Sequence, residues 1–280
     1  MDFNKFKINE FKLSTMVDYP AIVMVAKRGS GKSWVTRDIM HQKRKIPCGA
    51  VISLTDRENE FYRDFFPDIY IHYDFGDLFK RIIFRQKMMI EKQRIKSKQG
   101  KKVNPEAILV MDDCLAKKAN WAKDESILEI LMNGRHIKLT YVLTMQYPLG
   151  IAPDLRSNFD YIFLLNENFI TNQKRIYDNY AGMFPTFETF LVAFKVCTDK
   201  HGCMVINNRV NSNNIDDQVF WFKAKDHKRG EFFFGSKEFK EFHNENYDPK
   251  YKSRLTSNNF DINTFVRRRR NTPQIKVQKV

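Results

Sequence analysis

The sequence predicts an α/β fold with a mostly parallel central sheet and helices on both faces. From residue 21 to about residue 165, short apolar runs alternate with segments of helical periodicity. Several of the runs are continuously apolar, as strands covered on both faces are. With 280 residues, 42% of them hydrophobic, the chain is long enough for one large domain with additions, or for two small domains.

Six strands are expected, each separated from the next by a helical pattern or a turn. They span 21–26, 49–54, 69–72, 107–111, 139–144 and 161–165. Residues 166–200 are predicted to be largely helical. Three short β-like runs, 204–206, 219–222 and 232–234, are expected to form a hairpin or a small extension.

These patterns divide the chain into four expected parts. Residues 1–17 form an N-terminal arm, 18–200 the α/β core, 201–245 a small β/α extension, and 246–280 a basic tail. Asn, Lys, Ser and Arg dominate the last part, so we expect it to be flexible.

The segment Ala21–Ser33 is the most informative, because an apolar strand signal leads into Lys-Arg-Gly-Ser-Gly-Lys-Ser and then a helical pattern. This order is typical of a P-loop, whose backbone N–H groups and helix N-terminus hold phosphates. Gly29 and Gly31 let the backbone approach an anion. Lys32 is expected to reach the β- and γ-phosphates of ATP, and Ser33 to bind Mg²⁺. The expected nucleotide contacts are Lys27, Arg28, Gly29, Ser30, Gly31, Lys32, Ser33 and Trp34.

One position departs from the P-loop consensus, which has Gly where this chain has Ala26. We expect a slightly different entry turn rather than loss of binding, because alanine is the smallest substitute. The alternative is a chance Gly-Ser-Gly-Lys-Ser in a flexible loop. The preceding strand argues against it, as do apolar residues at helical spacing afterwards, namely Trp34, Val35, Ile39 and Met40. Arg28 either contacts the phosphates or faces solvent.

Residues 107–113 read Ala-Ile-Leu-Val-Met-Asp-Asp, a buried strand that ends in two carboxylates. In a P-loop enzyme, the strand next to the P-loop strand presents such an acid to the metal. Asp112 is therefore expected on the metal side, and Asp113 as the general base or the group that orients the attacking water. Many strands end in Asp at a turn, so the signal gains its weight from the P-loop that precedes it.

The strand expected at 139–144 has a candidate residue at each end. Gln146 follows it and would lie beside the Asp112–Asp113 strand, within reach of the γ-phosphate or the attacking water. Arg135 precedes it, away from the nucleotide of its own chain. From the residues alone, Arg135 equally suits a γ-phosphate contact in a neighbouring subunit and a cation near a helix C-terminus.

Taken together, these motifs resemble those of the FtsK–HerA family of DNA-pumping ATPases, and in particular its viral branch. That branch comprises the genome-packaging ATPases of poxviruses, other large DNA viruses and virophages. The matching segments are residues 26–33, 109–113, Gly-Arg-His at 134–136 leading to Thr-Met-Gln at 144–146, and 153–165. The resemblance covers roughly residues 18–200.

The resemblance implies an additional-strand P-loop NTPase fold related to RecA, with bound ATP and Mg²⁺. It assigns catalytic roles to Lys32, Asp113, Gln146 and Arg135, with Gln146 as the sensor and Arg135 acting in trans. It also implies a homo-oligomeric ring, a pentamer or hexamer, that drives double-stranded DNA into a capsid. A capsid or portal protein would be a partner, and the location would be the host cytoplasm, a viral factory or the virion.

The charge of the chain fits an anionic polymer as partner. Lys and Arg number 48 against 33 Asp and Glu, a formal net charge of +15. The alternative is a host with a lysine-rich proteome. Residues 92–102 carry six Lys or Arg and no acid, and Arg267–Arg270 form a tetrad. Each patch is equally a solvated face or a contact to a phosphate backbone.

Other function classes receive less support. No apolar run approaches the roughly 18 residues that span a bilayer, and the N-terminal residues lack the apolar part of a secretory signal. The four cysteines form no Cys-x-x-Cys pair, which indicates free thiols in a reducing compartment. Cys197, His201 and Cys203 lack a clear fourth ligand, so we expect a turn there. The alternatives are a P-loop kinase or other NTP-dependent enzyme, and a non-enzymatic DNA-binding capsid or scaffold protein.

Overall fold

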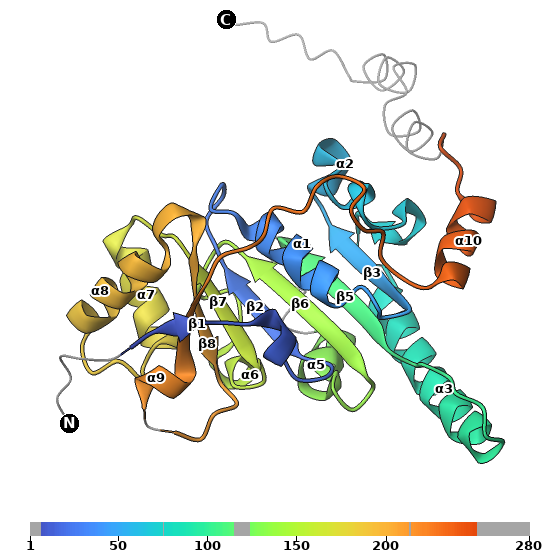
Figure 1. The fold of residues 1–280 in the computed structure, drawn as a ribbon, viewed down its shortest axis with the longest axis horizontal. Helices are drawn as coiled ribbons and strands as arrows, with labels where there is room; N and C mark the ends of the chain where they lie inside the picture. The colour runs from blue at the N-terminus through green and yellow to red at the C-terminus, as the bar shows by residue number, and fades with distance from the viewer. Residues whose placement is uncertain (1–6, 75, 115–123, 213, 251–280) are drawn as a thin grey trace, which may run out of the picture.

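The structure is a computed structural model that describes residues 7–74, 76–114, 124–212 and 214–250. Its centre is a nine-stranded sheet with the order β1-β9-β8-β7-β2-β6-β5-β3-β4 (Figure 1). The strands are β1 Asn9–Glu10, β2 Ala21–Val25, β3 Cys48–Ser53, β4 Ile71–His72, β5 Ala107–Asp112, β6 Leu139–Met145, β7 Tyr161–Leu165, β8 Cys203–Asn207 and β9 Val219–Phe222.

The sheet is mostly parallel, as the sequence predicts. The strands from β7 through β2, β6, β5 and β3 to β4 pair in parallel, and β8 is antiparallel to both of its neighbours. The six strands expected between residues 21 and 165 are all present. Because parallel strands end at the same edge, the loops after β2, β5 and β6 meet there.

Helices cover both faces of the sheet (Figure 1). They are α1 Lys32–Gln42, α2 Asp56–Asn59, α3 Leu78–Lys98, α5 Glu125–Asn133, α6 Pro153–Arg156, α7 Ile170–Tyr180, α8 Phe187–Cys197, α9 Ile215–Gln218 and α10 Lys237–Asn246. Short 3₁₀ turns lie at Leu13–Thr15, Tyr62–Asp64, Asp68–Tyr70 and Asp199–His201. The helices α7 and α8 account for the helical region expected at 166–200.

Alternate residues of the strands enter two separate cores, as the pleat of a sheet requires. On one face Ile22 and Met24 pack with Ile39 of α1. On the other, Val23 packs with residues of α3, α5, α7 and α8, of which Ile130 is fully buried. The P-loop strand β2 is therefore covered on both sides, which explains its continuous apolar run.

Three expectations about the sheet differ from the structure or are extended by it. The Asp112–Asp113 strand is not adjacent to β2, because β6 lies between them and pairs with both. Residues 232–234 form no strand, because Phe232 and Phe234 instead insert as single side chains into the core around Phe65. The hairpin β8–β9 extends the central sheet, while the division into core and extension stays a prediction.

None of the helices within the described ranges is both long and apolar enough to cross a membrane. The arginine tetrad at 267–270 lies outside the described residues.

Candidate nucleotide-binding site

The loop between β2 and α1 has the backbone that phosphate binding needs. Gly29 and Gly31 adopt positive φ angles of 77° and 98°, which L side chains rarely take. A Cβ built at either glycine meets nothing within 4 Å, so both face open space. The loop is closed by Ser30, whose hydroxyl donates to the carbonyl oxygen of Lys27 at 2.7 Å. The helix α1 then starts at Lys32 and directs its N-terminus at the loop.

The structure also explains why Ala26 replaces the first glycine of the consensus. Its N–H donates to the carbonyl oxygen of Met145 at 2.9 Å, which continues the pairing of β2 with β6 by one residue. Ala26 is 2% exposed and is not among the described residues with positive φ. A buried position without a positive φ has no need of glycine's conformational freedom.

The two carboxylates at the end of β5 face the P-loop lysine. The Lys32 ammonium contacts the Asp113 carboxylate and lies 3.9 Å from Asp112 Oδ1. The side chains of Lys32 and Asp112 are each 9% exposed. Asp113 has φ 51°, a value unusual for a residue with a side chain, and this bend directs its carboxylate back toward Lys32. The lysine ammonium and the two carboxylates thus lie together in a place that is largely shielded from solvent.

Thr144 of β6 holds the acids in place. Its hydroxyl donates to Asp112 Oδ1 at 2.6 Å and accepts from the Asp113 N–H at 3.1 Å. The amide of Gln146 donates to Asp113 Oδ2 at 2.9 Å, so the glutamine lies beside the acids as expected. From the far side, the Ser53 hydroxyl approaches Asp112 Oδ2 at 3.4 Å. The role of Thr144 is not visible in the sequence, because a threonine in a strand is ordinary.

Burial and charge act against each other on Asp112. Burial raises the pKa of this carboxyl above its ordinary value, while Lys32 and the Thr144 hydroxyl lower it. Tyr62 is fully buried nearby, and burial followed by the negative charge of Asp112 raises the pKa of its phenol well above the usual value. The phenol of Tyr62 therefore stays neutral and lines the same cleft as Asp112 and Asp113.

These residues line a cleft of about 830 Å³. Its walls include Lys27, Arg28, Gly29, Gly31, Lys32, Ser33, Trp34, Asp112, Asp113 and Gln146. Trp34 is 46% exposed and lines the cleft, where it was expected among the nucleotide contacts. Ser30 is buried behind the loop and is the one expected nucleotide contact that does not line the cleft.

A segment that the sequence motifs did not indicate completes the cleft. Residues 223–236, which we call the strap, run from β9 across α1 toward α10 (Figure 1). Their first four residues, 223–226, line the cleft, and so does His201. No motif marks the strap, because its contribution depends on folding back over a helix that lies almost 190 residues earlier.

The residues present fit Mg²⁺ with a triphosphate. The open space at Gly29 and Gly31 leaves room for phosphate oxygens against the backbone. Asp113 Oδ1 is buried and has no hydrogen-bond partner within the described part of the chain. The hydroxyl of Ser33 and the carboxylate of Asp112 are the hard oxygen ligands that Mg²⁺ prefers.

Comparison with known proteins places the chain in a viral family. It is 56% identical over 252 residues to the uncharacterized protein L437 of Acanthamoeba polyphaga mimivirus, covering 90% of this chain and 88% of that protein. The chain belongs to this family. A second viral family member, protein 075L of Invertebrate iridescent virus 6, is 34% identical over 237 residues, which cover 82% and 87% of the two chains. No protein-family model matches the sequence.

Two solved ATPase structures share the fold of this chain. EssC from Geobacillus thermodenitrificans, described as ATPases 2 and 3, superposes with a TM-score of 0.51 at 13% identity, over 82% of this chain and 45% of that one. The conjugation coupling protein TcpA of pCW3 gives 0.50 at 14% identity, over 88% and 66%. The genome packaging NTPase B204 of Sulfolobus turreted icosahedral virus 2 gives 0.49 at 15% identity, over 75% and 99%.

Arg135 of the viral protein lies at the other edge of the sheet, as expected. Its guanidinium pairs with the carboxylate of Asp160, which also accepts the Ala21 N–H at 2.8 Å and lies 3.4 Å from Arg209 Nη1. Arg135 follows α5 and its side chain is 48% exposed. It is absent from the walls of the nucleotide cleft, and its role toward a neighbouring subunit stays a prediction.

The cysteines show no sign of reactivity. Cys114, Cys197 and Cys203 are buried, Cys48 is half-buried, and all four are free thiols whose pKa is raised by burial. In the described residues, Cys197, His201 and Cys203 form no metal-ligand group. The segment between them is the 3₁₀ turn Asp199–His201, as expected.

Proposed function

We propose that the chain is an ATPase whose hydrolysis of ATP drives double-stranded viral DNA into a capsid. The observation that carries this proposal is the convergence of Lys32, Asp112, Asp113 and Gln146, from three different strand ends, on one cleft. A cation, a candidate metal ligand, a candidate base and an orienting amide are the groups that hydrolysis of a γ-phosphate needs.

Each residue has one role in this proposal. Lys32 would release Asp113 and bind the β- and γ-phosphates, whose charge then replaces the carboxylate as its partner. Ser33 and Asp112 would hold Mg²⁺, which supplies positive charge to the phosphate oxygens. Asp113 would accept the proton of the attacking water, and Gln146 would orient that water or contact the γ-phosphate.

DNA as the second partner is supported by the charge of the chain. A motor has to hold any sequence, so it grips phosphates rather than base edges. The net charge of +15 supplies the attraction. The C-terminal part of α3 projects beyond the sheet (Figure 1), and the run 92–98 on it is rich in Lys and Arg. We propose a ring of identical subunits in which Arg135 reaches the neighbour's nucleotide.

An ATPase assay with and without duplex DNA, run beside a mass measurement of the assembly, tests the proposal. We expect duplex DNA to raise the hydrolysis rate, and the half-saturating DNA concentration to rise steeply with salt. Hydrolysis that is indifferent to DNA at low salt would favour a kinase or another NTP-dependent enzyme. Absence of hydrolysis together with DNA binding would favour a capsid or scaffold protein.

A further inference from the structure

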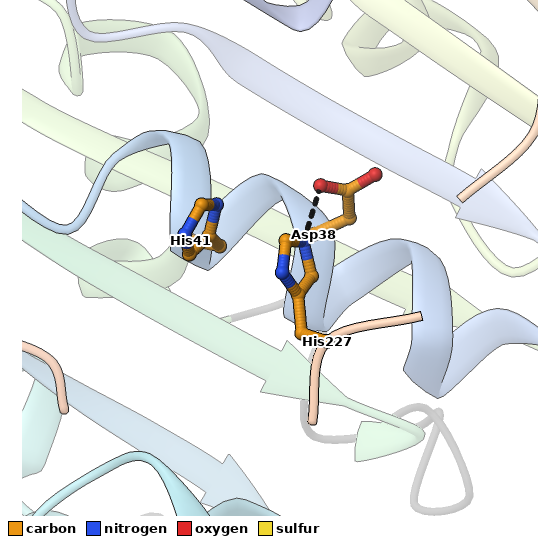
Figure 2. Close-up of side chains that lie close together, drawn as sticks. All are labelled: Asp38, His41 and His227. Atoms are coloured by element: carbon orange, nitrogen blue, oxygen red, sulfur yellow. Dashed lines mark hydrogen bonds and ion pairs between the residues drawn. The ribbon is translucent and has the colours of Figure 1, made fainter. Parts of the chain in front are cut away.

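A second group of polar side chains lies behind the nucleotide cleft, where the strap crosses α1. Asp38 and His41 are one helical turn apart on α1 and present their side chains to the same side. His227 comes from the strap, and its ring lies beside them and contacts Asp38 (Figure 2). Asp38 and His227 are buried, with 4% and 5% exposure, and His41 is half-buried.

The distances within this group are those of potential metal ligands. Asp38, His41 and His227 each place one potential ligand atom within 4.8 Å of the others. Among the described residues, this is the group of three such side chains that could hold a metal ion. His227 Nε2 lies 2.8 Å from Asp38 Oδ1. A fourth residue, Glu231, places Oε1 3.1 Å from His227 Nδ1 and 3.9 Å from His41 Nε2.

We propose that Asp38, His41 and His227 bind a divalent transition-metal ion, with Zn²⁺ as the best fit. Two imidazole nitrogens and one carboxylate are a common zinc ligand set, whereas Mg²⁺ prefers oxygen ligands alone. Glu231 Oε1 lies 3.1 Å from His227 Nδ1, and in the tautomer with Nδ1 protonated it accepts that proton and leaves Nε2 as the ligand atom. A carboxylate behind a metal-bound histidine in this way fixes the tautomer and the ring orientation.

The site is largely held in place by contacts that do not involve the histidines. The backbone N–H of Lys225 donates to Asp38 Oδ2 at 2.9 Å, which leaves Oδ1 for the ion. Arg37 Nη2 donates to the carbonyl oxygen of Lys228 at 3.3 Å. The rings of His41 and His227 stack at 4.0 Å with 30° between their planes, so closure on a metal requires rotation of the more exposed His41 ring.

The position of the site gives the metal a mechanical consequence. The helix α1 begins at the P-loop, and the strap residues 223–226 also line the nucleotide cleft. A metal that joins Asp38 and His41 of α1 to His227 of the strap fastens together two elements that border the cleft. The site is independent of the proposed ATPase reaction, because none of its three ligands lines the cleft.

The test is direct titration of the full chain, after treatment with a chelator, with Zn²⁺ and with Co²⁺ as a spectroscopic substitute. We expect one tight Zn²⁺ per chain, a rise in melting temperature, and visible Co²⁺ bands without a thiolate charge-transfer band. His41→Gln should abolish stoichiometric binding, and it keeps the fold because His41 is only half-buried. Glu231→Gln should weaken affinity by about 10- to 100-fold, as loss of an outer carboxylate does.

Two matched variants separate this site from others on the chain. His136→Gln removes an exposed histidine elsewhere, and Asp112→Asn removes the candidate Mg²⁺ ligand of the cleft. Both should bind Zn²⁺ as the unaltered chain does. No stoichiometric binding by the unaltered chain would overturn the proposal, and so would equal binding by His41→Gln, loss of binding in Asp112→Asn, or a thiolate band in the Co²⁺ spectrum.

Discussion

Thr144 and Asp112 face each other across the parallel pair β6–β5, and the Thr144 hydroxyl donates to Asp112 Oδ1 at 2.6 Å. The Thr144 hydroxyl oxygen also accepts the N–H of Asp113 at 3.1 Å. One buried hydroxyl thus fixes both the carboxylate proposed for the metal and the backbone turn that aims the proposed base. The geometry of the acidic pair depends on a strand that neither acid belongs to.

Replacing Thr144 by valine should therefore lower both stability and hydrolysis. The substitution keeps the shape but leaves the partly buried N–H of Asp113 without its acceptor, at a cost of about 1–3 kcal/mol in the free energy of unfolding. Hydrolysis should fall further than the affinity for ATP, because the acids act on the transition state. Denaturant unfolding and steady-state kinetics measure the two effects.

Thr140, four residues earlier on the same strand, provides the matched control. It is fully buried like Thr144, and its hydroxyl has no hydrogen-bond partner among the described residues. Thr140→Val should be neutral or stabilising, since it removes an unsatisfied polar group. Equal losses in the two variants would show that β6 tolerates no valine and that the Thr144 hydrogen bonds have no special role.

Lys32→Ala should abolish ATP hydrolysis while the chain remains folded. The lysine is the cation closest to the acid pair and starts α1 beside the phosphate cradle. Loss of one such stabilising donor costs about 10²- to 10³-fold in turnover or more. Hydrolysis per subunit and a circular dichroism spectrum are the measurements, with Lys45→Ala, an exposed lysine just beyond α1, as control. Unchanged turnover would exclude the P-loop as the site.

Ala26→Gly would restore the P-loop consensus, yet we expect it to give no gain in activity. Ala26 lies in buried backbone that has no positive φ and is bonded to Met145, where glycine only adds freedom to the unfolded chain. The expected cost is about 0.5–1 kcal/mol of stability. A melting curve and a rate at saturating ATP test this. A clear rise in rate would mean that the entry turn limits turnover after all.

The sequence predicted the parts of the fold that depend on local pattern. The strands β2 and β5 are covered on both faces and read as continuous apolar runs, and the glycines and carboxylates at their ends mark the site. The order of the strands depends on pairing between segments far apart in the sequence, and the position of β6 was not predicted. The residues of β2 and β5 themselves do not indicate that β6 lies between these two strands.

Two further features of the site left no local signal. Thr144 matters through its register with Asp112, and a strand threonine looks the same with or without that partner. The strap reaches the cleft by folding back over α1, so its residues carry no motif of their own. Phe232 and Phe234 of the strap look like strand residues, but they fill pockets in the core individually.

Arg135 gives the last prediction, because its neighbourhood supplies its own control. If Arg135 stabilises the γ-phosphate in the next subunit, Arg135→Ala should lower turnover by about 10³-fold or more and leave ATP binding intact. Mixing it with Lys32→Ala protein should restore part of the activity, since some interfaces then combine an intact arginine with an intact P-loop.

Arg209 provides the control, because it shares the Asp160 carboxylate with Arg135, at 3.4 Å. The substitution Arg209→Ala therefore weakens the same ion-pair group without removing the proposed trans residue. It should retain near-normal turnover. Equal inactivation by the two substitutions, without rescue at any mixing ratio, would reduce Arg135 to a structural partner of Asp160 at the amino end of the sheet.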